Sequence, residues 1–554
     1  MYVFITLLIG SSLIMLGKVN AALLVEVPRH GGSITEGIIG APRFINPLLA
    51  ASDADRDLTQ LVYSGLLHAT PDGRLVPDLA ERYSISEDGL VYTFTLRDNL
   101  RFHDGMSVTA EDVLFTVTLA QNPDVKSPKR ANWEGVHVDA PDTQTVVFTL
   151  AEAYQPFLEN TTLGILPKHI WEKTTPEQLP FNTFNADPVG SGPYRVTDFV
   201  RDDAGVPTRY ELTAFDDHAL GRPYITDLTF RFYTNEDDLF SALETGEVEH
   251  VSAITPENAR ALGDKGQRVE TFPLPRVFGV FFNQNQAPVF TNIEVRKALA
   301  VAVPREKIVR DVLLGYGVPA NGPIPPGLVT VDTPGIENEE VNIAEAQAIL
   351  ERNGWTRDEE KGIYVKKTKN ETTFLQFTIT TANIPELKHT AELLQNTWGK
   401  IGTQVDIKLF ETGNLNNEVI RPREYQALLF GQIIGRDLDP FPFWHSSQRN
   451  DPGLNIALYT NITTDQILED IRTTHGEDEL SRLYNEFSAE IAGDAPAAFV
   501  YTPDFIYIVN PDLKGLSLGT VTTPAERFLD ITHWYFYTDL VWRPFSNYNK
   551  TDTW

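Results

Sequence analysis

The sequence predicts an α/β fold, in which helices and strands alternate along the chain. Two kinds of pattern support this prediction. Apolar residues alternate with a period of two between Tyr92 and Leu96, which is typical of a half-buried strand. Apolar residues at helical spacing between Leu387 and Trp398 predict a helix, and a strand pattern at 405–409 follows it. A helix followed by a strand is typical of an α/β architecture.

Capping residues indicate where several helices begin. Thr109 is expected to open a helix that reaches about Ala120, because its hydroxyl can accept a hydrogen bond from a free backbone N–H. Asn342 is expected to open another helix, with Glu345 completing a capping box. In chain order we expect a strand, a loop and a helix within 30–70, strands at 92–96 and 146–150, a Pro/Gly-rich crossing at 187–194, strands at 210–213 and 228–232, helices from about 236, 292, 342 and 387, and a strand at 405–409.

The N-terminus carries an apolar run at residues 2–16, of the kind found in signal peptides and membrane anchors. Small residues around Ala21 suit cleavage after that position, whereas an uncleaved segment 2–25 would just span a bilayer. We therefore expect residues 1–25 to be a removed signal peptide or a retained anchor. Either way, the protein is expected to work outside the cytoplasm, in a periplasm or at the cell surface.

Composition and missing motifs exclude several classes of function. The 554-residue chain has a formal net charge of −30, which argues against nucleic-acid binding. It has no cysteine, so disulfides and thiol chemistry are excluded. The sequence contains no H-E-x-x-H, P-loop or G-x-S-x-G motif, and its eleven histidines are scattered. We therefore expect a protein that is not an enzyme and that needs no metal or cofactor.

One segment, from Gly431 to His445, combines charged and aromatic residues. Asp437 and Asp439 flank Leu438 next to Arg436, and proline and aromatic residues follow. Carboxylates close to large flat side chains suit a cationic group with an apolar companion, such as a peptide N-terminus. The alternative is a proline-rich loop that packs on its own aromatic residues, and composition alone favours that alternative.

An ordered set of short motifs resembles family 5 of the bacterial extracellular solute-binding proteins, the peptide- and nickel-binding group. Any one motif is weak, but all of them in this order between about residues 30 and 535 are specific. The motifs are FINP at 44–47, LVYSGL at 61–66, LVPDLA at 75–80, YTFTLR at 92–97, FHDG at 102–105, TAEDV at 109–113, VGSGPY at 189–194, VRKAL at 295–299 and the Asp-Pro-aromatic segment at 437–444.

The resemblance implies a periplasmic-binding-protein-like fold of type II. Such a fold has two α/β lobes joined by a hinge, with an extra domain inserted in the first lobe. The implied boundaries are 30–71, 186–284 and 501–540 for lobe I, 72–185 for the inserted domain and 285–500 for lobe II.

The resemblance also implies a function, which is the capture of an oligopeptide by hinge closure and its delivery to the membrane permease of an ABC importer. The protein would act as a monomer. The main chain of the ligand would pair with Gly431, Gln432 and Ile433 in lobe II and with a segment around 50–53 in lobe I. The alternatives are an oligosaccharide or a chelated metal as ligand, a membrane-tethered chaperone or adhesion module, and a secreted hydrolase.

Side-chain roles follow from the same resemblance. Asp437 would pair with the peptide α-amine, and Asp439 is the alternative for that role. The other expected contacts are Arg436 with a ligand carboxylate, Trp444 as a wall of the pocket, and Tyr63 and Asn283 near the lobe interface.

Overall fold

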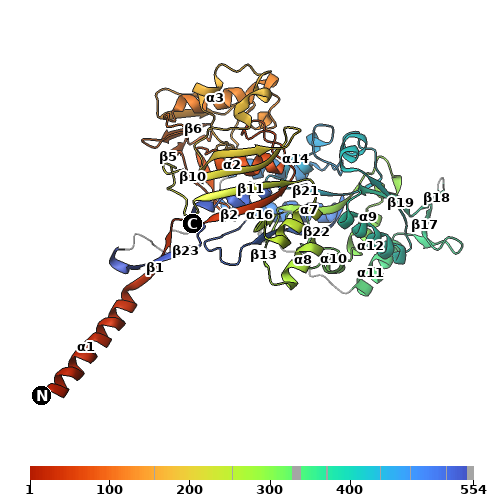
Figure 1. The fold of residues 1–554 in the computed structure, drawn as a ribbon. Coiled ribbons are helices and arrows are strands. Elements are labelled where there is room, and N and C mark those ends of the chain that lie inside the picture. The colour runs from red at the N-terminus through yellow and green to blue at the C-terminus, as the bar shows by residue number, and fades with distance from the viewer. Residues whose placement is uncertain are drawn as a thin grey trace.

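The computed structural model describes residues 1–154, 156–252, 254–326, 339–369, 372–436, 438–474, 476–519 and 521–545. Within these residues the centre of the molecule is a mixed, twelve-stranded sheet (Figure 1). Two parts of this sheet are named here by one strand each. The β2 half contains β2 (Ser33–Ile39), β9 (Tyr194–Arg201), β10 (Pro207–Ala214), β11 (Asp227–Tyr233), β12 (His250–Ser252) and β13 (Arg268–Pro273). The β21 half contains β14 (Arg276–Phe282), β15 (Gly317–Pro319), β19 (Gln376–Ala382), β20 (Gln404–Phe410) and β21 (Ala427–Ile433).

The long strand β22 (Ala497–Val509) belongs to both halves. Its first part pairs with β14 and β15, up to Pro503 opposite Gly317. Its second part pairs with β12 and β13, starting at Asp504 opposite Pro273. The chain crosses between the halves a second time at the short link from β13 to β14. The two crossings lie side by side, because the Leu274 backbone N–H donates a 3.0 Å hydrogen bond to the Pro503 carbonyl.

Each half has its own hydrophobic core. One cluster of buried side chains extends from Val277 to Tyr501 and packs around the β21 half. A second cluster extends from Ile34 to Trp534 and joins the β2 half to the region between residues 79 and 179. That region carries the four-stranded sheet of β5 (Ala80–Ile85), β6 (Val91–Leu96), β8 (Thr145–Thr149) and β7 (His137–Asp139). A third, smaller cluster lies beneath α7 (Glu236–Thr245) and α8 (Pro256–Asp264).

The remaining elements surround these sheets. The other strands are β1 (Leu24–Arg29), β3 (Leu67–Ala69), β4 (Leu75–Pro77), β16 (Thr356–Arg357), β17 (Tyr364–Lys367), β18 (Thr372–Phe374) and β23 (Tyr537–Trp542). The helices are α1 (Tyr2–Leu23), α2 (Asp53–Val62), α3 (Ala110–Gln121), α4 (Arg130–Trp133), α5 (Phe157–Asn160), α6 (Lys168–Trp171), α7 (Glu236–Thr245), α8 (Pro256–Asp264), α9 (Ile293–Val301), α10 (Arg305–Asp311), α11 (Glu339–Arg352), α12 (Pro385–Ile401), α13 (Thr412–Asn414), α14 (Phe441–Trp444), α15 (Ile462–Thr473) and α16 (Glu477–Asp494).

Helix α1 projects from the body of the molecule, and the ribbon formed by β1 and β23 lies at its base (Figure 1). Among the described residues, no helix has the combination of length and apolar character that is needed to cross a membrane.

The mixed helix and sheet content confirms the predicted α/β fold. Tyr92, Phe94 and Leu96 are the buried positions of β6, as their alternation predicts. Helix α3 follows Thr109 as expected, although the Thr109 hydroxyl is bonded to the Asp112 carboxylate. The expected start at Asn342 was wrong, because that residue lies inside α11, which already runs from Glu339.

Three of the motifs, LVYSGL, FHDG and VGSGPY, meet at the end of α2. Gly192 N–H donates a 2.8 Å hydrogen bond to the carbonyl of Val62, and His103 N–H donates one of 2.8 Å to the carbonyl of Gly190. A Cβ atom at Gly190 would overlap the Val62 carbonyl oxygen. Glycine is therefore required here because the backbone approaches α2 too closely for any side chain.

A buried ion cluster fixes the C-terminal segment to the β2 half. The Arg527 guanidinium lies 2.7 Å from Oδ2 of Asp57 on α2 and 3.0 Å from Oε1 of Glu36 on β2. The Tyr507 hydroxyl donates a 2.8 Å hydrogen bond to Glu36. Burial raises the pKa of Glu36 to about 7, although Arg527 acts in the opposite direction. Two carboxylates thus share one buried guanidinium.

Replacing Arg527 should destabilise the protein more than replacing either carboxylate. Arg527→Met leaves two carboxylates buried without their cation, so we expect the free energy of unfolding to fall by about 3–5 kcal/mol. Urea unfolding followed by circular dichroism measures this loss. The control is Glu36→Gln, which keeps the pair between Arg527 and Asp57 and should cost clearly less. Equal losses for the two variants would contradict this account of the cluster.

Candidate ligand-binding site

A cavity of about 990 Å³ lies between the two halves. Its wall is drawn from segments that are far apart in the chain. The β2 half and the associated small-sheet region contribute residues between 47 and 220 and between 522 and 532. The β21 half contributes residues between 433 and 454 together with Arg472. A volume of this size is at the upper end of the range of about 300–1,000 Å³ that is usual for ligand pockets.

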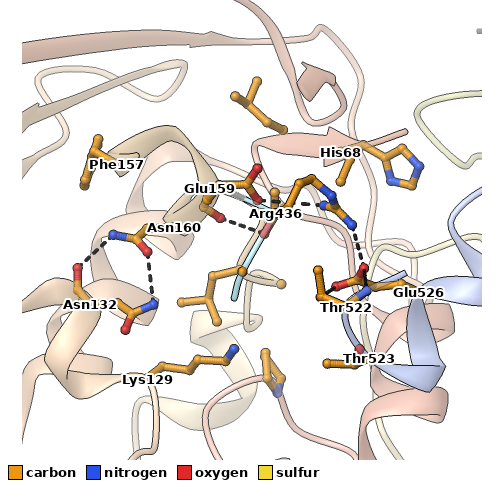
Figure 2. A pocket seen from close by; sticks show the side chains of 18 of the residues that line it. His68, Lys129, Asn132, Phe157, Glu159, Asn160, Arg436, Thr522, Thr523 and Glu526 are labelled. Carbon is orange, nitrogen blue, oxygen red and sulfur yellow. Dashed lines mark hydrogen bonds and ion pairs between the residues drawn. The ribbon is translucent and has the colours of Figure 1, made fainter. Parts of the chain in front are cut away.

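Arg436 links the two halves across this cavity. It follows β21, and its guanidinium lies 2.6 Å from Oε2 of Glu526 and 3.7 Å from Oε2 of Glu159 (Figure 2). Glu526 is held in place because the Thr522 backbone N–H and the Thr522 hydroxyl both donate hydrogen bonds to its carboxylate. Only 8% of the Arg436 side chain is exposed, so these ion pairs are shielded from water.

A second ion pair lies on the β21 side of the wall. Arg472 of α15 contacts the Asp439 carboxylate with its Nε at 3.0 Å and its Nη2 at 2.6 Å. The backbone N–H of Phe441 also donates to Asp439, at 3.1 Å. The Arg472 guanidinium lies 3.7 Å from the centre of the Phe441 ring and 5.6 Å from that of Tyr154, which belongs to the opposite half. The Asp439 carboxylate is therefore already neutralised by the protein.

Burial shifts the pKa of two more ionisable groups on the wall toward their neutral forms. Burial lowers the pKa of His68 to about 4, and its Nε2 lies 2.8 Å from the Leu529 carbonyl, to which the neutral ring donates. Burial raises the pKa of Asp78 to about 7. At neutral pH His68 is therefore uncharged and Asp78 is only partly ionised.

The main chain of β21 presents a partly unpaired edge. Along its whole length β21 pairs with β14, but on its other side β19 reaches only as far as Leu428. Ile434 N–H donates to Pro275 on the β14 side, so alternation directs the N–H and C=O groups of Gly431 and Ile433 the other way. Within the described residues no strand meets these groups, and the Ile433 side chain lines the cavity.

The structure brings part of the predicted site together at the cavity. Tyr63, Ile433, Arg436 and Asp439 all line it. The Tyr63 hydroxyl is turned toward the carbonyl of Ile45, at 3.4 Å. Asp437 lies outside the described residues. The ligand-binding roles assigned to these residues stay predictions.

The other predicted residues do not line the cavity. Gly431 packs against the ring of Phe278, and Gln432 is buried. Asn283 is fully buried, and its side chain bonds to backbone groups of neighbouring loops. Trp444 was expected to form a wall, but its ring is enclosed by aromatic residues of the β21 core and has no exposed surface.

Sequence reasoning missed several polar residues of the wall. They are His68, Asp78, Lys129, Asn132, Glu159, Asn160, Arg472, Thr522, Thr523 and Glu526. They stand in stretches of sequence that contain no recognisable motif, and they are separated by up to several hundred positions. No local signal marks them, because only the packing of the two halves assembles them.

Comparisons with known proteins agree with this geometry. The chain is 28% identical over 518 residues to the oligopeptide-binding protein AppA of Bacillus subtilis, covering 92% of each chain. It is 25% identical to the dipeptide-binding protein of Escherichia coli, covering 91% of this chain and 96% of that protein.

Solved structures show the same similarity. The structure of Bacillus subtilis AppA in complex with a nonapeptide has a TM-score of 0.70 at 26% identity, covering 92% of this chain and 99% of that one. The ABC transporter substrate-binding protein CtaP of Listeria monocytogenes has a TM-score of 0.76 at 27% identity, with the same coverage.

The model of the bacterial extracellular solute-binding proteins, family 5, matches residues 74–454, which is more than half of the chain. The predicted two-lobed fold is thereby confirmed, whereas the residue boundaries of the lobes and the inserted domain stay a prediction. With its cavity between two halves and this match, the chain belongs to family 5 of the bacterial extracellular solute-binding proteins.

Proposed function

We propose that the protein captures oligopeptides in the cavity between its halves and delivers them to the permease of an ABC importer, without catalysing a reaction. The observation that carries this proposal is the partly unpaired edge of β21 beside the cavity between the halves. An extended peptide can pair with such an edge through its own main chain, which gives affinity without reading each side chain. The similarity to a nonapeptide-bound protein supports a peptide as the ligand.

Hinge motion is supported by the way the halves are connected. The links at Leu274-Pro275 and at Pro503-Asp504 lie next to each other, so a rotation about this line opens the cavity and leaves both cores intact. The ion pairs of Arg436 join the halves at the cavity and hold them closed. A ligand that touches both walls favours the closed state, because only that state provides all of its contacts.

The place and assembly of the protein follow from the same proposal. We infer that it works as a monomer outside the cytoplasm, in a periplasm or at the cell surface, with residues 1–25 as a signal peptide or an anchor. The extracellular character of the family supports this location.

Peptide binding should raise the thermal stability of the protein. A peptide at a hundred times its Kd adds about 2.7 kcal/mol to the free energy of unfolding. Trp133 lines the cavity, so its fluorescence should change as well. A library of peptides of two to nine residues, tested by thermal unfolding and fluorescence, measures both effects. If no peptide causes a shift but an oligosaccharide or a metal–histidine chelate does, the ligand class is wrong and the fold assignment stands.

Main-chain pairing predicts sensitivity to N-methylation of the ligand. A methyl group on a peptide nitrogen that meets β21 removes one hydrogen bond and blocks the close approach of the strands, so affinity should fall about tenfold or more. Methylation at the next position along the peptide should matter less, because successive N–H groups of a strand point to opposite sides. Isothermal titration of the two methylated series tests this. Equal effects at all positions would argue against pairing with β21 alone.

Removing the Arg436 ion pairs should favour the open state. For Arg436→Met we expect a larger radius of gyration of the ligand-free protein in small-angle X-ray scattering and a severalfold weaker peptide affinity. The control is Arg482→Met, which removes a guanidinium that pairs with Glu479 and Glu486 on the exposed surface of α16. That variant should leave both quantities unchanged. An unchanged radius and affinity in Arg436→Met would show that these ion pairs do not control closure.

A further inference from the structure

The cavity wall carries four cationic side chains, and three of them have carboxylate partners. Arg436 pairs with Glu526 at 2.6 Å, and Arg472 pairs with Asp439 at 2.6 Å. Arg56 pairs with Asp53 at 3.0 Å. The fourth is Lys129, and within the described part of the chain no carboxylate lies within ion-pair distance of its Nζ.

Lys129 is placed where a ligand would meet it. It precedes α4, in the region that carries the small sheet, and its side chain is accessible from the cavity. Figure 2 shows the side chain extending into the pocket from the wall that carries Asn132, with its amino nitrogen on the side of Thr523. The side chain of Lys129 is exposed to the cavity, and partial desolvation by the surrounding protein lowers its pKa, with the positive charge of Arg56 acting in the same direction. An opposite charge from a ligand would offset that loss of hydration.

The neighbouring groups do not supply this opposite charge. Glu526 is the acidic residue whose charge favours the protonated form of Lys129, but its carboxylate is already bonded to Arg436 and Thr522. The amides of Asn132 and Asn160 bond to each other, with Asn132 Nδ2 at 3.0 Å from Asn160 Oδ1. The wall around Lys129 therefore provides polar groups and leaves its charge without a counterion.

We propose that Lys129 holds a carboxylate of the bound ligand. This inference rests on the proposed capture of peptides. It also specifies the end of the cavity at which an anionic group of the ligand is bound. The carboxylate is the C-terminus of the peptide or an acidic side chain, and in both cases the ammonium of Lys129 donates a charge-assisted hydrogen bond to it. The ligand then spans the cavity, with its main chain at the edge of β21 and its carboxylate at the region before α4.

This assignment differs from the one made from the sequence, in which Arg436 receives the carboxylate. A ligand carboxylate at Arg436 would compete with Glu526 and Glu159, and those ion pairs join the two halves. Lys129 can bind an anion without breaking any ion pair of the described structure. Closure is thereby assigned to Arg436, and recognition of the carboxylate is assigned to Lys129.

The test uses one uncharged hexapeptide from the binding library in three forms: a free acid, a C-terminal amide, and an amide with one internal glutamate. Calorimetry with the full-length protein should show the free acid or the glutamate form binding about ten- to a hundredfold more tightly than the plain amide. The form that binds tightly identifies the source of the carboxylate. In Lys129→Met this preference should disappear, and in Lys129→Arg most of it should remain.

Lys173→Met provides the control, because Lys173 is an exposed lysine of the same region that does not line the cavity. It should keep the full preference, and thermal unfolding should show that all three variants are folded. Equal binding of the three peptide forms by the unaltered protein, or a preference that persists in Lys129→Met, would overturn the role of Lys129 and leave peptide capture intact. Failure of the unaltered protein to bind any form would overturn both proposals.

Discussion

The two halves of the molecule are held together by a strand that they share. The first part of β22 is hydrogen-bonded into the β21 half and its second part into the β2 half, with the change at Pro503 and Asp504. A shared strand keeps the halves side by side and prevents them from separating. Each half nevertheless has its own core, so a rotation at the crossing does not disturb the packing on either side.

The charges around the cavity separate into two groups with different consequences. Arg436 and Arg472 are satisfied by carboxylates of the protein, so the closed arrangement does not leave them unpaired. Lys129 is left without such a partner within the described residues. Lys129 is exposed in the described structure, so it loses hydration only when a ligand covers it. Under the proposed role of Lys129, a ligand carboxylate supplies the partner that the covered ammonium needs, and recognition of the ligand is then coupled to closure.

The segment from Gly431 to His445 shows how far local sequence reasoning extends. It correctly directed attention to this part of the chain, since Ile433, Gly435, Arg436 and Asp439 reach the cavity. It could not determine which groups remain available to a ligand. Arg472 neutralises Asp439 from 33 positions further along the chain, and Glu526 occupies Arg436 from 90 positions away. Trp444 has the composition of a pocket wall, yet its ring packs in the core of the β21 half.

By itself the sequence determined the elements and the family. Strand periodicity at Tyr92–Leu96 and the helical pattern before Trp398 depend on local contacts, and the ordered motifs depend on the chain alone. The close approach to α2 that requires glycine in the VGSGPY motif is, in contrast, a property of the tertiary structure. Only the tertiary structure decided which side chains share the cavity, because Lys129, Arg436 and Glu526 come from three distant segments. Whether each charge is paired depends on where the other two lie, and the folding of the two halves around β22 sets those positions.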